Sequence, residues 1–269
     1  MTEKTFHRAK KYFGQNFLVD ETIVAQIISV IAPHSDQHLV EIGPGLGALT
    51  KHLLPKVKAM DVIEIDRDII PKLEQQCHGL GRLIIHQADV LKFDFATLVR
   101  GNENLKIIGN LPYNISTPLL FHLVSFCSLV SEMIFMLQKE VVERICAPLG
   151  SKAYGRLTVM LQYHYQAQHL LDVPPQAFKP APQVHSAILR LVPHKNKPFL
   201  AKDVKLFAQI VLVAFNARRK TLRNALKNLV NDEIFLTLDI DSQLRPEQIS
   251  LGQYVAISNQ LVGEKTCSN

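Results

Sequence analysis

The chain has 269 residues, of which 47% are hydrophobic, so it is long enough to bury a core in one large domain or in a large and a small one. Its formal net charge of +6 is compatible with a polyanionic partner, although many basic proteins bind none. The 4 cysteines form no CxxC pair and show no Cys/His ligand spacing, which indicates neither a disulfide framework nor a metal site.

Neither a secretory signal nor a membrane span is expected. No apolar stretch follows the basic residues at the N-terminus, so we expect the protein in the cytoplasm. Residues 119–137 are nearly long enough to span a bilayer, but His122 and Glu132 would be costly at its centre. We expect a core helix up to about Leu129 and a buried strand from Met133.

Short apolar runs alternate with helix-like stretches through the first half of the chain. The runs are continuous rather than apolar at every second position, which is typical of strands covered on both faces. They predict an α/β fold, a parallel sheet with helices on either side. The expected strands are residues 38–43, 60–66, 82–89, 105–110 and 132–137.

A helix is expected next, at residues 154–162. Two strand-like segments follow, 163–171 and 186–193, separated by a proline-rich stretch. They are too close for a helical crossover, so we expect an antiparallel pair at one edge of the sheet.

The pattern changes after a proline-interrupted linker at residues 194–200. From Asp203 onward only helical patterns occur, at residues 204–215, 218–229 and 250–261. We therefore expect an α/β domain of residues 1–195 and a small helical domain of residues 199–269.

The first strand runs into a glycine loop, EIGPGLGA at residues 41–48. Gly43, Gly45 and Ala48 satisfy the dinucleotide pattern G-x-G-x-x-G/A, and Glu64 lies where a ribose-binding acid is expected, so a nicotinamide-dependent oxidoreductase is one interpretation. The same residues also fit a loop that holds S-adenosylmethionine, with Glu64 accepting hydrogen bonds from the ribose hydroxyls. A tight turn with an incidental acid is the structural alternative.

Asp89 favours the methyl donor. It ends the third strand, where a carboxylate followed by a backbone amide can recognise the edge of an adenine ring. A single aspartate at a strand end is more often a turn former, so it counts only in combination with Glu64 and the glycine loop.

The fourth strand ends in GNLPYNIST, residues 109–117, at the edge of the sheet where such folds bind ligands. The Asn110 side-chain oxygen and the Leu111 carbonyl are suited to accept hydrogen bonds from an adenine amine and to direct its lone pair at a methyl group. Pro112 fixes the backbone, and Tyr113 offers a ring face to the base. Their contribution is orientation and electrostatics, and a plain turn is the alternative.

A target base must leave its stack to reach such a pocket, and aromatic rings recover part of the lost stacking energy. Phe178 is the candidate for the second face of the base. A core aromatic under a proline-rich loop is the other interpretation.

The segment RRKTLRNALKNL is predicted to be a helix with cations on one face. We expect this face to bind RNA phosphates together with basic residues near the N-terminus, and a solvated helix face is the alternative. The expected contacts are Arg218, Arg219, Lys220 and Arg223, with His7, Arg8, Lys10 and Lys11 at the entrance.

Taken together, these motifs resemble the ribosomal RNA adenine dimethyltransferases, specifically the small-subunit dimethyladenosine transferases. The resemblance covers nearly the whole chain in the family's order. Its segments are residues 13–18, 40–50, 62–68, 109–117, 138–163, 173–191 and 215–224.

The resemblance implies a Rossmann-like methyltransferase that uses S-adenosylmethionine and transfers two methyl groups to each of two adjacent adenosines, in a hairpin near the end of small-subunit rRNA. The partner is then the immature small ribosomal subunit, and we expect a monomer that holds no metal. The residues implied to contact the methyl donor are Asn16, Leu18, Gly43, Glu64, Asp89 and Asn110. An oxidoreductase, a non-catalytic assembly factor and a DNA adenine methyltransferase are the alternatives.

Overall fold

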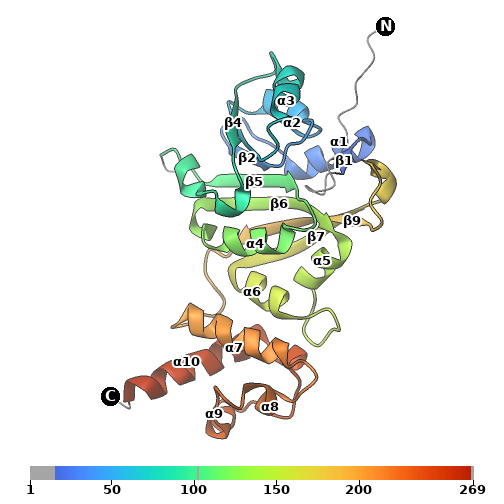
Figure 1. The fold of residues 1–269 in the computed structure, drawn as a ribbon. Helices are drawn as coiled ribbons and strands as arrows, with labels where there is room; N and C mark the ends of the chain where they lie inside the picture. The colour runs from blue at the N-terminus through green and yellow to red at the C-terminus, as the bar shows by residue number, and fades with distance from the viewer. Residues whose placement is uncertain (1–15, 102, 268–269) are drawn as a thin grey trace. The chain divides into compact units, whose positions relative to one another are not determined.

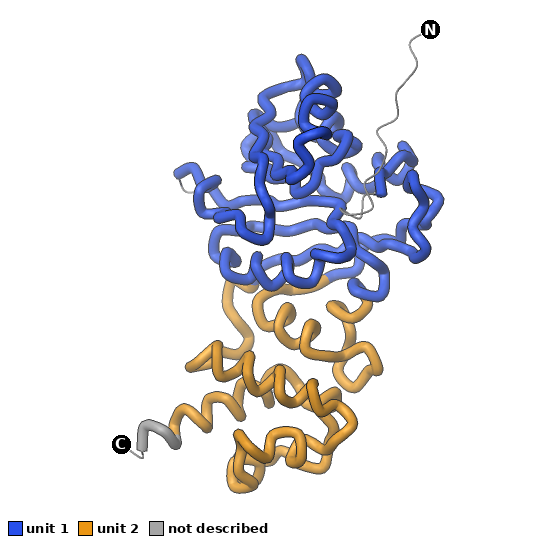
Figure 2. Tube along the Cα trace, in the orientation of Figure 1, with its two compact units in different colours: residues 1–142, 168–193 blue, residues 143–167, 194–269 orange. Residues whose placement is uncertain are grey.

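The computed structural model describes residues 16–101 and 103–267. Residues up to 142 together with 168–193 form a first compact unit (unit 1), and residues 143–167 together with those from 194 onward form a second (unit 2; Figure 2). The sequence predicted a division near residue 195. Unit 2 thus also includes residues 143–167, which lie within the predicted first domain.

Unit 1 is organised around a seven-stranded sheet with the order β4-β3-β2-β5-β6-β9-β7 (Figure 1). The first five strands in this order are parallel, and β9 is antiparallel to β6. The strands lie where the apolar runs predicted them, and the α/β fold is confirmed. Their bounds are β2 His38–Ile42, β3 Met60–Glu64, β4 Leu83–Gln87, β5 Leu105–Asn110, β6 Val130–Gln138, β7 Tyr165–Val173 and β9 Ser186–Pro193.

The order of the strands determines where a ligand can bind. The chain proceeds from β2 outward through β3 to β4, and then returns to β5 on the other side of β2. The strand order therefore reverses between β2 and β5. In open α/β sheets a crevice forms at such a point, outside the carboxyl ends of the strands.

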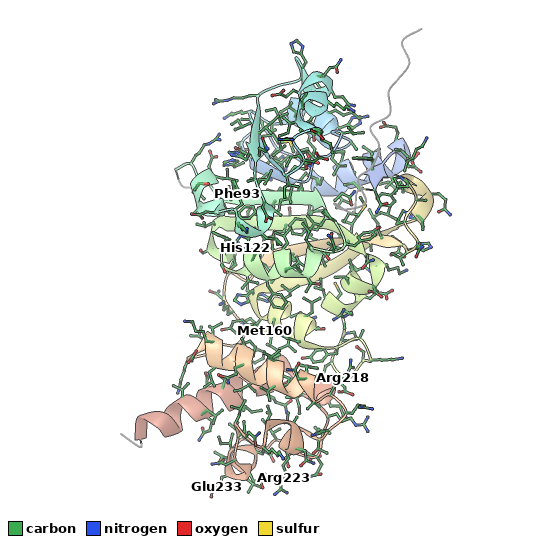
Figure 3. All side chains as sticks on the ribbon, viewed as in Figure 1. Phe93, His122, Met160, Arg218, Arg223 and Glu233 are labelled. Atoms are coloured by element: carbon green, nitrogen blue, oxygen red, sulfur yellow. The ribbon has the colours of Figure 1, made fainter. Side chains whose placement is uncertain are left out.

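Helices cover both faces of this sheet. Three of them, α1 Glu21–Ile31, α2 Thr50–Leu53 and α3 Ile70–Cys77, share one buried apolar cluster with alternate residues of the central strands. The fourth, α4 Ser116–Val124, buries its leucines. It also joins an aromatic cluster in which the ring centroids of His122 and Phe126 are 5.2 Å apart (His122 is labelled in Figure 3). The predicted helix up to Leu129 thus ends at Val124, and a 3-10 turn follows at Cys127–Leu129. The short helix α5 spans Lys139–Ile145.

A small second sheet, absent from the prediction, lies beside the N-terminal end of α1. It pairs β1 Phe17–Leu18 with β8 Phe178–Lys179. Two residues are too few to show a strand periodicity, which explains why the sequence did not reveal it. The α1 helix starts directly after β1 because the Asp20 carboxylate accepts hydrogen bonds from the backbone of Thr22 and Ile23.

Five α-helices lie wholly within unit 2 among its described residues. They are α6 Arg156–His164, α7 Val204–Asn216, α8 Leu222–Leu226, α9 Asp232–Thr237 and α10 Leu251–Cys267. Asp203 caps α7 by accepting hydrogen bonds from the backbone of Lys205 and Leu206.

The predicted single helix over residues 218–229 is wrong. Residues 217–220 form a turn, and α8 begins only after Thr221, whose hydroxyl caps the backbone of Asn224. The backbone N–H of Leu222 donates to the Leu244 carbonyl, so tertiary contacts set the start of this helix. No helix in the described part of the chain has the length and apolar character needed to cross a membrane.

Candidate active site

A tight glycine loop joins β2 to α2. Gly43, Gly45 and Gly47 all have positive φ angles, of 64°, 54° and 81°. This backbone suits glycine, because a Cβ atom is strained there. The loop brings bare backbone to the carboxyl edge of the sheet, at the point where the strand order reverses.

Glu64, at the end of β3, is held against this loop. One of its carboxylate oxygens accepts a hydrogen bond from Gly45 N at 3.3 Å, and the other accepts one from Asp66 N at 2.8 Å. The side chain is buried, and this burial raises the pKa of the carboxyl group. The acid is thus fixed beside the glycines rather than extended into solvent.

Asp89 stands at the end of β4 in the same region. Its carboxylate accepts a hydrogen bond from Leu91 N at 3.0 Å and caps a short 3-10 helix. This is the turn-forming role that the sequence left open. Asp89 also lines the cavity described below, so the capping bond leaves the residue at the site.

The tetrad of residues 110–113 follows β5. Gly109, directly before the tetrad, lets β5 lie close to β2, because a Cβ atom on residue 109 would lie 2.5 Å from the Ile42 carbonyl oxygen. Leu111 N donates to the Met136 carbonyl, so the tetrad is tied to β6 as well. The Asn110 amide nitrogen donates to the Asn16 carbonyl at 3.1 Å, and within the described residues no hydrogen bond engages the Asn110 side-chain oxygen.

These segments surround one cavity of 1120 Å³ in unit 1. This volume is in the range of pockets that hold a nucleoside-sized molecule with room beside it. The cavity gathers every residue that was predicted to contact the methyl donor, and the whole tetrad. These are Asn16, Leu18, Gly43, Glu64, Asp89, Asn110, Leu111, Pro112 and Tyr113.

Phe178 is the exception, and its predicted place at the site needs correction. It is 4% exposed, belongs to the apolar core and is not among the residues that line the cavity. In β8 it pairs with Leu18, which belongs to the same core and also lines the cavity. Its neighbours Lys179 and Pro180 line the cavity instead.

The predicted phosphate contacts do not form one helix face. Arg218 donates to the Lys152 carbonyl and lies 3.5 Å from the Glu247 carboxylate, whereas Arg223 pairs with Asp232 at 2.5 Å. Figure 3 shows Arg218 and Arg223 well apart within unit 2. Arg219 and Lys220 are exposed on the turn, and His7, Arg8, Lys10 and Lys11 lie outside the described residues.

Two residues at the site were missed by the sequence analysis. Glu41 is 2% exposed, lines the cavity, and accepts a hydrogen bond from the Thr50 hydroxyl at 2.6 Å. An acid inside the apolar run HLVEI was the available signal. Ser186 bonds to the Tyr113 hydroxyl across 73 residues of chain, and no local pattern could have indicated it.

Burial raises the pKa of Glu41 to about 7, and the nearby Glu64 carboxylate adds to the rise. Two buried acids, Glu41 and Glu64, therefore line the cavity. A ligand with positive charge would be favoured there.

Comparisons with known proteins agree with this geometry. Residues 6–262 match the family model for ribosomal RNA adenine dimethylase. The ribosomal RNA small subunit methyltransferase A of Shewanella pealeana is 53% identical over 259 residues, covering 96% of this chain and 97% of the relative. That of Shewanella denitrificans is 52% identical over 255 residues, covering 95% and 96%.

Among solved structures, a dimethyladenosine transferase from Plasmodium falciparum superimposes with a TM-score of 0.80 at 24% identity, covering 93% of this chain and 98% of that one. The 23S rRNA methyltransferase ErmE gives 0.73 at 21% identity, covering 92% and 100%. At these identities the two structures show that the fold is shared.

The sheet, its reversal point and the glycine loop show a Rossmann-like fold, and the family match makes it a methyltransferase that uses S-adenosylmethionine as cofactor. This decides between the two interpretations of the glycine loop, and the oxidoreductase interpretation is wrong. The chain belongs to the ribosomal RNA adenine dimethylase family.

Proposed function

We propose that this protein dimethylates the exocyclic amines of two adjacent adenosines in a hairpin near the 3' end of small-subunit rRNA, with S-adenosylmethionine as methyl donor. Its substrate is the immature small ribosomal subunit late in assembly, and it acts as a monomer in the cytoplasm. The observation that carries this proposal is the single cavity that joins the glycine loop, Glu64, Asp89 and the tetrad at residues 110–113. The relatives' names and the family description support rRNA as the substrate.

The donor fits the glycine side of the cavity. Gly43 and Gly45 present bare backbone to this side of the cavity, and a Cβ atom on Gly45 would come 3.3 Å from the Phe17 ring. In this proposal Glu64 accepts hydrogen bonds from the ribose hydroxyls, Asp89 binds the adenine edge, and Asn16, Leu18 and Asn110 line the same cavity. When bound, the donor supplies a methyl group on a positively charged sulfonium.

The tetrad holds the target amine. The hydrogen bond from the Asn110 amide nitrogen to Asn16 leaves the side-chain oxygen as the acceptor. This oxygen and the Leu111 carbonyl accept the two amine hydrogens, so the nitrogen lone pair is directed away from both and towards the methyl group. No strong base is needed, because the amine loses its proton after it has attacked.

The same pair of acceptors explains dimethylation. A monomethylated amine keeps one hydrogen and can still be held. A dimethylated amine has none, so the acceptors lose their partners and the product is released. Pro112 fixes the backbone directly after the second acceptor, the Leu111 carbonyl, and the Tyr113 ring stacks on the base.

For the helical part, residues 199–269, we propose RNA binding. Arg219 and Lys220 carry this proposal, because both are exposed on the turn before α8 and neither has an ion pair within the described residues. Arg218 and Arg223 are each held by an acid, which reduces the charge that they present to phosphate.

The decisive experiment is mass spectrometry of rRNA from cells with and without this protein. Adjacent dimethyladenosines in small-subunit rRNA should disappear when the gene is deleted and return when it is restored. A chain carrying Asn110→Ala, expressed at the same level, is the matched control and should not restore them. If the modification persists without the protein, the proposed function is wrong. If Asn110→Ala restores it fully, the tetrad mechanism is wrong.

A further inference from the structure

The Tyr113 hydroxyl has one hydrogen-bonding partner within the described residues, the Ser186 hydroxyl at 2.7 Å. Ser186 is the first residue of β9 and has 0% of its surface exposed. It is not among the residues that line the cavity. Ser186 thus lies behind the tyrosine ring, where it can act on a bound base only through Tyr113.

The Ser186 and Tyr113 segments are both hydrogen-bonded to the same strand, β6. Ser186 lies opposite Gln138 in the antiparallel pairing of β9 with β6. The tetrad is tied to β6 by the hydrogen bond from Leu111 N to the Met136 carbonyl. The Tyr113 carbonyl also accepts a hydrogen bond from the Ser116 hydroxyl at 3.1 Å, which fixes the backbone from which the ring extends. The ring is thus held at its base and at its tip.

The geometry of a phenol defines what the tip contact controls. The hydroxyl oxygen lies on the axis about which the ring turns, so the Ser186 contact leaves the tilt of the ring to its neighbours. A swing of the whole ring about χ1 would carry the hydroxyl away from Ser186. The contact therefore selects one χ1 rotamer and with it the position of the ring centre.

Burial raises the pKa of the Tyr113 hydroxyl, so the phenol stays neutral and keeps its proton at physiological pH. A neutral ring is a stacking surface rather than a base. This matches a role in placing the adenine and leaves no role for Tyr113 in removing its proton.

We propose that Ser186 is a positioning residue for methyl transfer, because it fixes the Tyr113 ring on which the target adenine stacks. The inference rests on the proposed function and adds to it a residue outside the cavity. It predicts an effect on the rate of transfer from bound substrate, since a ring that populates several rotamers holds the amine in line less often.

The test compares Ser186→Ala, Tyr113→Phe and the double variant in single-turnover methylation of small-subunit particles at saturating substrate. Each single change should lower the rate about three- to tenfold, the range for loss of one neutral hydrogen bond. The double variant should be no slower than the slower single variant, because both changes remove the same contact. Donor affinity should stay at the wild-type value, and the midpoint of thermal unfolding should fall only by the few degrees expected for the loss of one neutral hydrogen bond.

Ser258→Ala is the matched control. Ser258 is also 0% exposed, and within the described residues its hydroxyl also makes one hydrogen bond, donated to the Asp203 carbonyl in unit 2. This variant should methylate at the wild-type rate. Loss of rate in both serine variants would attribute the effect to buried serines in general and would overturn the inference.

A spectroscopic measurement reports on the contact without catalysis. The chain has 6 tyrosines, so 13C labelling at the tyrosine Cζ gives few NMR signals, and Tyr113→Phe identifies the one to follow. Ser186→Ala should shift that signal, whereas Ser258→Ala should not. An unshifted signal overturns the inference.

Two further outcomes separate the inference from the function on which it rests. An active wild type with an unaffected Ser186→Ala variant, or with losses that multiply in the double variant, overturns the inference alone. A wild type that forms no dimethyladenosine overturns the proposed function as well.

Discussion

Glu41 gives the sharpest prediction about electrostatics. Its carboxyl group is buried, and its pKa is raised from 4.5 to about 7. A shift of this size is equivalent to about 3 kcal/mol between the two protonation states. Because the folded-state pKa lies above the unfolded one, the contribution of this group to stability is fully present below about pH 4.5 and is lost as pH rises through about pH 7.

The perturbation is Glu41→Gln, which keeps the shape and an acceptor for the Thr50 hydroxyl but removes the titration. Relative to wild type, the variant should gain about 2 kcal/mol of unfolding free energy between about pH 5.5 and about pH 8.5. Urea unfolding of both proteins at the two pH values, followed by circular dichroism, measures this difference. The reasoning is refuted if the two proteins show parallel pH dependence.

The same group couples to the methyl donor. S-adenosylmethionine brings positive charge into a cavity that Glu41 lines, so binding favours the ionised acid. The donor affinity of the wild type should rise about tenfold between about pH 6 and about pH 8, and that of Glu41→Gln should stay flat. Isothermal titration calorimetry at several pH values measures both. A wild-type donor affinity that does not change with pH would show that donor binding is not coupled to the ionisation of Glu41.

Three further predictions concern the tetrad, the strand behind it and the basic turn. Asn110→Ala should lower methyl transfer about 10²-fold with an unchanged unfolding midpoint, and near wild-type turnover would mean that another group orients the amine. Gly109→Ala places a Cβ atom 2.5 Å from the Ile42 carbonyl oxygen, so it should lower both the unfolding midpoint and donor affinity. Gly263→Ala should lower neither, because beyond its own helical turn the added Cβ atom would meet no atom of the described residues within 4 Å. Neutralising Arg219 and Lys220 should flatten the salt dependence of RNA binding by about one unit of slope per lost phosphate contact. An unchanged slope in RNA titrations would mean that this turn is a solvated surface that does not contact RNA. Donor affinity is the internal control and should not change.

The sequence by itself determined the sheet and the outline of the site. Continuous apolar runs encode buried parallel strands locally, and each of the five predicted parallel strands is present. Glu64, Asp89 and Asn110 could be placed at one edge because parallel strands bring their carboxyl ends together. The glycine loop could also be predicted from the sequence, because its backbone conformation depends on the glycines of the loop itself.

Only the tertiary structure decided where Phe178, Ser186 and the basic residues before α8 lie. Phe178 is buried in the core of unit 1, in a two-residue strand that the sequence did not reveal, and Ser186 reaches Tyr113 across 73 residues of chain. The cations of residues 218–223 are divided between a turn and α8, because the start of that helix is set by contacts with residues far along the chain. The direction of a side chain depends on the packing of distant segments, and a local pattern carries no information about that packing.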